Sequence, residues 1–317
     1  RDVIVQIEVW DRFDYSREPW QQNPFNPQNN VNYMVDECGM NVEYPDHPYK
    51  DLQPFFHTIE NMPRYEPKLE LVKKYQEKFV DKILFYSLQH GNVLYCMNNE
   101  TNTPLEWGQY WLSYIRDKAD QQNKEVYVTD MIDHAFMPQD ADELRIMTAE
   151  TDVYTFLDIS QINSRNLNQA HWDSLRWIMN DLKKFPTRPV NNTKVYGGPQ
   201  NRDIFGSSKD GVEKFCRDII GGCASARFHR PPAGNGLSDI SKNAIRAFRK
   251  IETEMKFWNL YPRMELLGER EPDEAYLTAQ TGKKYALYFP DQGAVTLDLR
   301  DFNKHYQLKW INISTGE

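Results

Sequence analysis

The sequence lacks the long apolar runs and motifs of several common protein classes. No stretch approaches the roughly 18 consecutive apolar residues that span a bilayer, so the sequence predicts no transmembrane helix. No Gly-x-Gly-x-x-Gly or phosphate-binding loop follows an expected strand, which argues against a nucleotide-binding sheet. The Gly-x-Ser-x-Gly element of serine hydrolases is absent as well.

Cysteine and net positive charge are also scarce. The four cysteines, Cys38, Cys96, Cys216 and Cys223, form no Cys-x-x-Cys pair, so they predict no zinc knuckle and require no disulfide. No second histidine lies at ligand spacing from His229, and we expect no metal and no cofactor. The net charge of −8, from 38 Lys and Arg against 46 Asp and Glu, argues against a general nucleic-acid binder.

Aromatic residues, in contrast, are abundant, with eight Trp, 18 Tyr and 16 Phe. Aromatic faces serve as platforms in sugar-binding clefts, but they also fill cores, and both roles stay open at this point. Trp10, which ends an expected strand, is the candidate for stacking on a sugar. Trp107 and Trp111 are spaced i,i+4 and are expected to pack a helix against a sheet.

Short apolar strands alternate with amphipathic helices along most of the chain, which predicts a parallel sheet covered by helices. Polar residues follow nearly every strand, and this favours a (β/α)8 barrel, whose strand ends meet at one site, over an open doubly wound sheet. The chain opens directly on a strand, so we expect the first two barrel units, about 60 residues, to be missing. The expected strands are 3–10, 92–97, 125–129, 153–157, 189–196 and 223–228, and the expected helices are 67–90, one through Trp107 and Ile115, 168–184, 210–220 and 238–258.

Two further segments differ from this alternation. The polar stretch 14–66 is rich in Pro and Asn, and a loop of this length is usually functional or a lid. Residues 263–317 contain short strands separated by turns, at 276–279, 285–290, 294–299 and 306–310. The sequence therefore predicts two domains, a partial barrel over 1–262 and an incomplete antiparallel β-sandwich over 263–317.

The sharpest motif is Asn98-Asn99-Glu100, which follows an apolar strand. Hydrolysis of a glycosidic bond needs a carboxylic acid that protonates the leaving oxygen and a second carboxylate across the bond. Glu100 suits the first role, and Asn99 is placed to bind a sugar hydroxyl. The alternative is that Glu100 is a solvated residue that caps the next helix.

Asn99-Glu100, after what would be the fourth barrel strand, resembles the acid/base signature of the large clan of retaining barrel glycosidases. From Val3 to about Gly316 the chain resembles a group of bacterial glycoside hydrolases in which the barrel is followed by a β-module described as collagen-binding. The resemblance implies an extracellular or periplasmic protein that degrades a poly- or oligosaccharide. The matching stretches are 92–107, 226–231 and 285–299.

The sequence departs from that clan at the nucleophile, which is a Glu at the end of the seventh strand. The corresponding stretch here carries Lys194 and no glutamate. The second carboxylate is then Asp158, Asp130 or Glu8, and we favour Asp158 because it directly follows a strand, although it also suits a helix N-cap. Retaining and inverting mechanisms both stay open. The alternatives are a non-catalytic carbohydrate-binding protein on a degenerate barrel and a structural extracellular protein.

Cationic residues are expected at the same rim of the barrel, where arginine forks would bind carboxylate or sulfate. They predict an anionic glycan, unless they neutralise the acids of the barrel itself. The sugar, its linkage and the oligomeric state are left open by the sequence. The expected substrate-binding residues are Asn99, Glu8, Trp10, Asp130, Lys194, Tyr196, Arg227 and His229, with Arg230 on the same rim.

Overall fold

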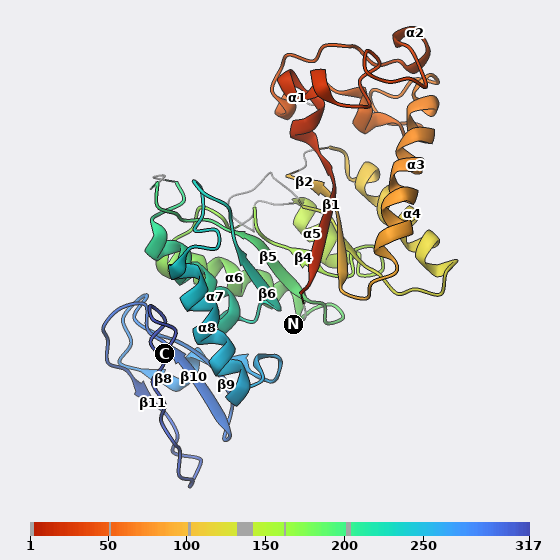
Figure 1. Cartoon of the computed structure of the whole chain (residues 1–317). Coiled ribbons are helices and arrows are strands. Elements are labelled where there is room, and N and C mark those ends of the chain that lie inside the picture. Colours follow the sequence, from red (N-terminus) through yellow and green to blue (C-terminus); the bar gives the residue numbers. More distant parts are fainter. Residues whose placement is uncertain (1–2, 51, 101–102, 132–141, 162, 201–203) are drawn as a thin grey trace. The chain divides into compact units, whose positions relative to one another are not determined.

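The structure, a computed structural model, describes residues 3–50, 52–100, 103–131, 142–161, 163–200 and 204–317 (Figure 1). The chain folds into two compact units. Among the described residues, unit 1 comprises those up to 131 together with 142–157, and unit 2 comprises those from 158 to 317. The mixed α/β class with parallel strands is confirmed.

Unit 1 is built on a parallel sheet in the order β1–β2–β3, with β1 at Val5–Asp11, β2 at Val93–Asn99 and β3 at Tyr127–Thr129. Asp11 pairs with Asn99 across the first two strands, so these strands end together. Three helices accompany the sheet (Figure 1): α3 (Leu69–Ser87), α4 (Leu105–Asp120) and α5 (Asp142–Ala149).

The helix predictions for unit 1 are confirmed, and the reason is the spacing of their apolar residues. Helix α4 buries Trp107, Trp111 and Ile115 completely, at intervals of four residues along one face. Helix α3 buries Val72 and Val80 in the same way. Both helices therefore turn an apolar stripe toward the core of the unit.

An aromatic cluster forms the centre of that core, and Trp10 lies in the middle of it. The indole ring centroid of Trp10 lies 5.2 Å from that of Phe79, 5.4 Å from that of Phe55 and 5.5 Å from that of Trp111. Trp10 has no exposed surface. Such pairs add about 0.5–1.5 kcal/mol each beyond the area that they bury, so the cluster is a main source of stability in unit 1.

The stretch after β1, predicted as a functional loop or lid, supplies part of this cluster. Phe25 and Phe55 are buried, and the Tyr15 and Phe55 rings stack with centroids 3.9 Å apart. The sequence did not predict these few aromatic residues as part of the core, because the stretch around them is mostly polar. Its short helices are η1 (Arg12–Tyr15), α1 (Arg17–Gln22), α2 (Val35–Cys38), η2 (Pro48–Lys50) and η3 (Pro54–His57).

Unit 2 holds a second three-stranded sheet, in the order β4–β5–β6, whose strands β5 and β6 pair in parallel. Helix α7 begins at a reciprocal cap between Ser207 and Asp210 and ends at Gly222, whose φ of 104° stops the helix. The elements are β4 (Leu157–Asp158), α6 (Asn168–Leu182), β5 (Val190–Val195), α7 (Ser208–Gly221), β6 (Ser225–Phe228) and α8 (Asp239–Glu254).

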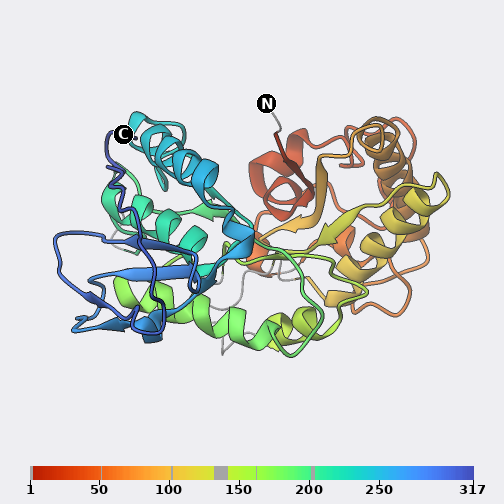
Figure 2. The same cartoon turned by 90° about the horizontal axis from the view of Figure 1, so that it is seen from below.

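The C-terminal part of unit 2 is antiparallel and packs on α7. Tyr276, Ala286 and Tyr288 share one buried core with Phe215 and Cys216 of α7, and the blue strands lie beside this helix in both views (Figures 1 and 2). The strands form two sheets, β10–β9–β7 and β11–β8. The elements are η5 (Phe257–Asn259), β7 (Tyr261–Pro262), η6 (Met264–Leu266), β8 (Leu267–Gly268), β9 (Tyr276–Gln280), β10 (Lys284–Tyr288) and β11 (Thr296–Leu297).

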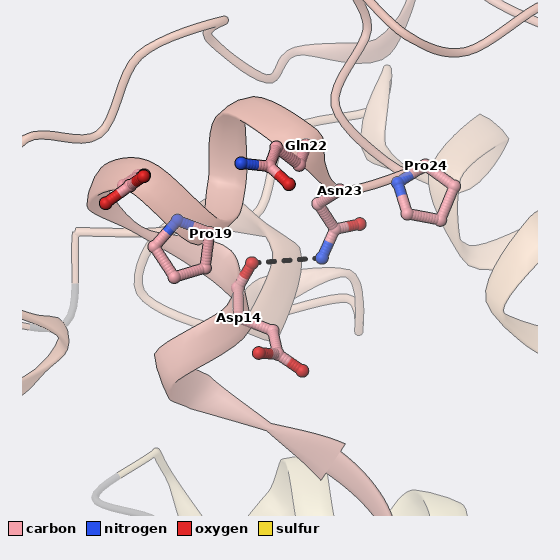
Figure 3. Close-up of a pocket in the computed structure, with 6 residues that line it drawn as sticks. Asp14, Pro19, Gln22, Asn23 and Pro24 are labelled. Carbon is pink, nitrogen blue, oxygen red and sulfur yellow. Dashed lines mark hydrogen bonds between the residues drawn. The ribbon is translucent and has the colours of Figure 1, made fainter.

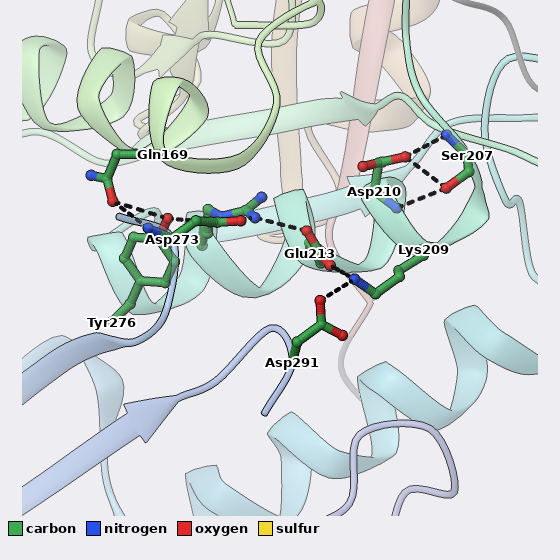
Figure 4. A network of polar contacts seen from close by, with 9 residues as sticks. Gln169, Ser207, Lys209, Asp210, Glu213, Asp273, Tyr276 and Asp291 are labelled. Carbon is green, nitrogen blue, oxygen red and sulfur yellow. Dashed lines mark hydrogen bonds and ion pairs between the residues drawn. The ribbon is translucent and has the colours of Figure 1, made fainter. Parts of the chain in front are cut away.

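A polar network accompanies this packing between α6, α7 and the C-terminal part (Figure 4). Lys209 lies 2.8 Å from Asp291 and 2.7 Å from Glu213, and the Asp273 backbone donates to Gln169 of α6 at 3.0 Å. Apolar and charged contacts thus join α7 to β9 and to the loops around it. The predicted domain boundary at 262–263 falls within unit 2 and stays a prediction.

Two predicted strands are wrong. The strand expected at 153–157 is reduced to Leu157–Asp158, because the backbone N–H groups of Val153 and Tyr154 donate to Glu150 in the turn after α5. The stretch 306–310 forms no strand, although its residues alternate like one. An alternation of apolar and polar residues forms a strand only where a neighbouring strand is available to pair with it.

Two general expectations can be compared with the described residues. All four cysteines are buried free thiols. Within the part of the chain that the structure describes, no helix combines the length and the apolar character of a membrane span.

Candidate functional site

In unit 1, the ends of β1 and β2 bring Asp11 and Asn99 together. The Asn99 side-chain amide donates to Asp11 Oδ2 at 2.9 Å, and Asp11 Oδ1 accepts the Phe13 backbone N–H at 3.0 Å. Asn99 is 9% exposed. Asp11 therefore fixes the orientation of the Asn99 amide at the carboxyl end of the sheet.

Glu100 follows directly and ends the regular strand. Its φ of 51° lies in the left-handed region, which costs a residue other than glycine of order 1–3 kcal/mol. The side chain is half-buried. A strained, partly accessible glutamate at the end of a parallel strand is a feature of functional sites, where the surrounding structure holds such a conformation.

Asn98 is the residue before Asn99 in β2. Because side chains alternate along a strand, it points to the opposite face of the sheet from Asn99. Its backbone N–H donates to Asp130 Oδ1 at 3.0 Å, and its side-chain amide lies 3.1 Å from Oδ1 and 3.0 Å from Oδ2 of the same carboxylate. The Asn98 Oδ1 atom accepts the indole N–H of Trp107 at 3.2 Å. We call these three residues the Asn98–Asp130 clamp, with Trp107 as its anchor on α4.

Asp130, for which the sequence predicts a substrate-binding role, is held inside this clamp, and that role stays a prediction. The side chain is 2% exposed, and Asp130 Oδ1 also accepts the Met131 backbone N–H at 2.8 Å. Burial raises the pKa of the Asp130 carboxyl group to about 6, although hydrogen bonds from Met131 and Asn98 act in the opposite direction. Both oxygens are engaged inside the protein, so the described arrangement offers no face of Asp130 to a sugar.

Gly108 on α4 leaves the space that this carboxylate fills. A Cβ atom at position 108 would lie 2.2 Å from Asp130 Oδ2. We expect Gly108→Ala to destabilise the chain by about 1–3 kcal/mol, because the pinned carboxylate must shift to admit a methyl group. This reverses the gain of about 1 kcal/mol that a Gly to Ala change normally brings inside a helix.

Urea denaturation of the two proteins measures this effect. Gly91→Ala is the matched control, because nothing lies within 4 Å of a Cβ at position 91. A Gly108→Ala variant that is more stable than the wild type would show that Asp130 is not held in place.

Two further predicted site residues, Trp10 and Glu8, do not lie at the end of β1 beside Asp11 and Asn99. Trp10 is enclosed by the aromatic cluster, so it has no ring face for a sugar, and its role is packing. Glu8 is exposed but lies three residues before the end of β1, which reaches Asp11. Alternation places Glu8 on the Trp10 face of the strand and not on the Asp11 face.

A pocket of about 440 Å³ opens beside the carboxyl end of β1 (Figure 3). It is shaped by η1 and α1, and the Asn23 amide donates to the Asp14 backbone carbonyl at 3.0 Å across its wall. Burial, and secondly the charge of Asp11, raise the pKa of Asp14. The pocket is lined by Asp14, Glu18, Pro19, Gln22, Asn23 and Pro24, of which Asp14 and Glu18 are acidic.

In unit 2, Asp158 ends β4 as the sequence predicts. Thr193 donates its hydroxyl to Asp158 Oδ2 at 2.5 Å, and the Ser160 backbone N–H donates to Oδ1 at 2.9 Å. Asp158 is 3% exposed. The structure therefore joins the ends of β4 and β5 through this carboxylate.

Tyr196 and His229 lie together after β5 and β6. Their ring centroids are 4.6 Å apart, and Tyr196 stacks on Phe205 at 4.3 Å. Gln161 donates to the Tyr196 hydroxyl at 3.1 Å. These side chains form one packed aromatic and hydrogen-bonding group, in which Tyr196 is 6% exposed.

The predicted cationic rim is only partly present. Lys194 lies within β5 and is 4% exposed, so it presents no charge at an open edge. Arg227 and Arg230 are exposed, and Arg227 donates to the Thr193 carbonyl at 2.8 Å. Among the residues that the structure describes, no group of three or more His, Cys, Asp or Glu side chains is arranged to hold a metal ion.

Asp11 and Asn98 are the site residues that sequence reasoning missed. Asp11 had a usable signal, since it follows an apolar strand directly, as Asp130 and Asp158 do. Asn98 belongs to the sharpest motif, but its bond to Asp130 could not be predicted, because Asp130 lies 32 residues further along the chain.

No family model matches the chain, and no curated protein matches it significantly. A solved glycoside hydrolase family 5 structure from Bacteroides vulgatus is similar to it at 14% identity and a TM-score of 0.43, over 67% of this chain and 54% of that one. A second structure, described as a glycoside hydrolase, has 12% identity and a TM-score of 0.42, with 65% and 54% covered. The chain thus spans about half the length of these structures.

Proposed function

We propose that this chain is a glycoside hydrolase and that Glu100 is its general acid/base. The observation that carries the proposal is the position of Glu100 at the carboxyl end of β2, next to an asparagine whose amide is fixed by Asp11. The side chain is half-buried, so it is partly removed from solvent and still accessible. A general acid for a glycosidic oxygen needs both properties.

Asn99 and the pocket beside β1 supply the binding part of the proposal. An amide held by a carboxylate is pre-oriented to hydrogen-bond a sugar hydroxyl. The pocket lining carries two carboxylates and two amides, which suit the hydroxyl groups of a carbohydrate. Because Asp14 and Glu18 would repel an acidic group, this pocket favours a neutral sugar. The exposed Arg227 and Arg230 in unit 2 are the remaining support for an anionic one.

The second carboxylate that the sequence favours is Asp158, which ends β4, and this assignment stays a prediction. Burial does not distinguish Asp158 from Asp130, since they are 3% and 2% exposed and both oxygens of each carboxylate accept hydrogen bonds. The proposal also includes the expectations that the parallel strands belong to a (β/α)8 barrel, that the C-terminal strands belong to a β-sandwich, and that the protein acts outside the cytoplasm on a poly- or oligosaccharide.

One observation favours a second candidate, a carbohydrate-binding protein without hydrolytic activity. Strand β5 runs from Val190 to Val195 and carries Thr193 and Lys194 near its end, with no glutamate. A retaining enzyme of the clan that the sequence resembles would need a carboxylate there. Tyr196 and His229 would then bind a sugar that is not cleaved.

The experiment is a screen of this chain against a panel of poly- and oligosaccharides, with release of reducing ends as the readout and affinity electrophoresis as the measure of binding. Cleavage of at least one glycan, lost in Glu100→Gln, supports the proposal. Binding of a glycan without cleavage contradicts it and supports the second candidate.

A further inference from the structure

The Asn98–Asp130 clamp reaches β2 two residues before the proposed catalytic residue, and both oxygens of its carboxylate accept hydrogen bonds. Asp130 Oδ1 accepts from the Asn98 backbone, the Asn98 amide and the Met131 backbone, and Oδ2 accepts from the Asn98 amide. Asn98 and Asp130 are 1% and 2% exposed. A buried polar pair with every acceptor engaged rigidifies the structure around it.

We propose that Asp130 is a positioning residue for Glu100, which acts by fixing the last residues of β2 and does not touch substrate. The inference rests on the proposed function and assigns Asp130 a different part in it from the substrate contact that the sequence suggests. It also gives a shared role to Asn98 and Gly108, which lie against this carboxylate, and to Trp107, which bonds to Asn98.

The strained backbone at Glu100 explains why the end of β2 needs the Asn98–Asp130 clamp. A left-handed φ at a residue other than glycine persists only where neighbouring contacts determine the backbone. Asn98 lies two residues before Glu100, and both its backbone N–H and its side chain are bonded to Asp130. The clamp therefore holds the strand immediately before the strained residue. A reacting group displaced by about 1 Å loses on the order of 100-fold in rate.

Helix α4 holds the clamp from the other side. The Trp107 indole donates to Asn98 Oδ1 at 3.2 Å, and the missing side chain of Gly108 leaves room for Asp130 Oδ2. Trp107 is itself fully buried in the aromatic cluster. The position of the β2 end is thus tied to the core of unit 1.

The chemistry of the pair allows a reciprocal test. Asp130→Asn places an amide nitrogen against the Asn98 amide, and Asn98→Asp places two carboxylates against each other. The double variant Asn98→Asp/Asp130→Asn restores one donor and one acceptor, and the Trp107 indole and the two backbone N–H groups keep acceptors. Asp120→Asn, an exposed change at the end of α4, is the control.

We expect each single variant to lower kcat by about 10- to 100-fold with little change in KM, and the double variant to recover most of the loss. Kinetics are measured well below the unfolding temperature of each variant. Loss of kcat that the double variant does not recover, or a rise in KM alone, would overturn the positioning role.

Hydrogen exchange at the Asn98 backbone amide and the NMR resonance of the Trp107 indole N–H give a readout that needs no activity. We expect protection of the Asn98 amide to fall in both single variants and to return in the double variant. If the wild type cleaves no glycan but this pattern appears, the proposed function fails and the clamp stands. If the wild type is active and Asp130→Asn keeps full kcat, the positioning role fails and the proposed function stands.

Discussion

Glu100→Gln is expected to lower kcat for an unactivated glycan by about 10²- to 10⁴-fold, which is the usual contribution of a general acid. The amide has nearly the same size but cannot donate a proton to the leaving oxygen. KM should change little, because Asn99, Asp11 and the pocket beside β1 are untouched. Steady-state kinetics on the glycan identified by the screen measure the effect.

A comparison of leaving groups separates loss of the acid from a general defect. An aryl glycoside with a stable phenolate leaving group needs little protonation, so the loss in Glu100→Gln should be much smaller on it than on the natural linkage. Glu106→Gln is the matched control, because Glu106 is an exposed residue in the first turn of α4. Equal losses on both substrates would assign Glu100 a structural role.

The position of Glu100 at a strand end could be predicted from the sequence, because it depends on local residue patterns. The apolar run before Asn98 and the helical spacing of Trp107 and Trp111 place a strand, a turn and a helix in order. The same kind of pattern located helix α6 at 168–182, close to the expected 168–184. Periodicity captures elements whose apolar face is continuous.

The surroundings of each site residue could not be predicted from the sequence, because they depend on contacts between segments that are far apart along the chain. Trp10 and Glu8 were both selected as residues near a strand end, but β1 continues to Asp11, and this shifts the end of the strand past both of them. Asp130 was selected for its charge after a strand. Its burial depends on Gly108 and Asn98. The periodicity of apolar residues along one sequence does not show that Asp130 contacts either of them.

The second large effect concerns unit 2. Arg217→Met is expected to lower the free energy of unfolding by about 3–5 kcal/mol, because it leaves carboxylates without their buried partner. The Arg217 side chain is 1% exposed, and its Nη2 lies 2.8 Å from Glu213 and 2.9 Å from Asp273. Its guanidinium carbon also lies 5.5 Å from the Tyr276 ring centroid of β9, a favourable cation–π distance.

Matched variants separate the buried pair from ordinary surface charge. Arg249→Met removes an arginine of α8 that is 68% exposed and paired with Glu252, and we expect it to cost about 0.5 kcal/mol or less. Arg217→Met/Glu213→Gln should recover part of the loss, since it removes the carboxylate that burial leaves uncompensated. Lys209, which also contacts Glu213, limits that recovery.

The location of the damage tests what the arginine does. Arg217 joins α7 to the loop that carries Asp273, and the network of Figure 4 continues from there to Gln169 of α6. Hydrogen exchange in Arg217→Met should therefore rise first in β9 and β10, while β1 and β2 of unit 1 keep their protection. A uniform loss in both units, or a cost no larger than that of Arg249→Met, would contradict this role. Because Tyr276 and Tyr288 share a core with α7, the C-terminal strands and this helix are expected to unfold together.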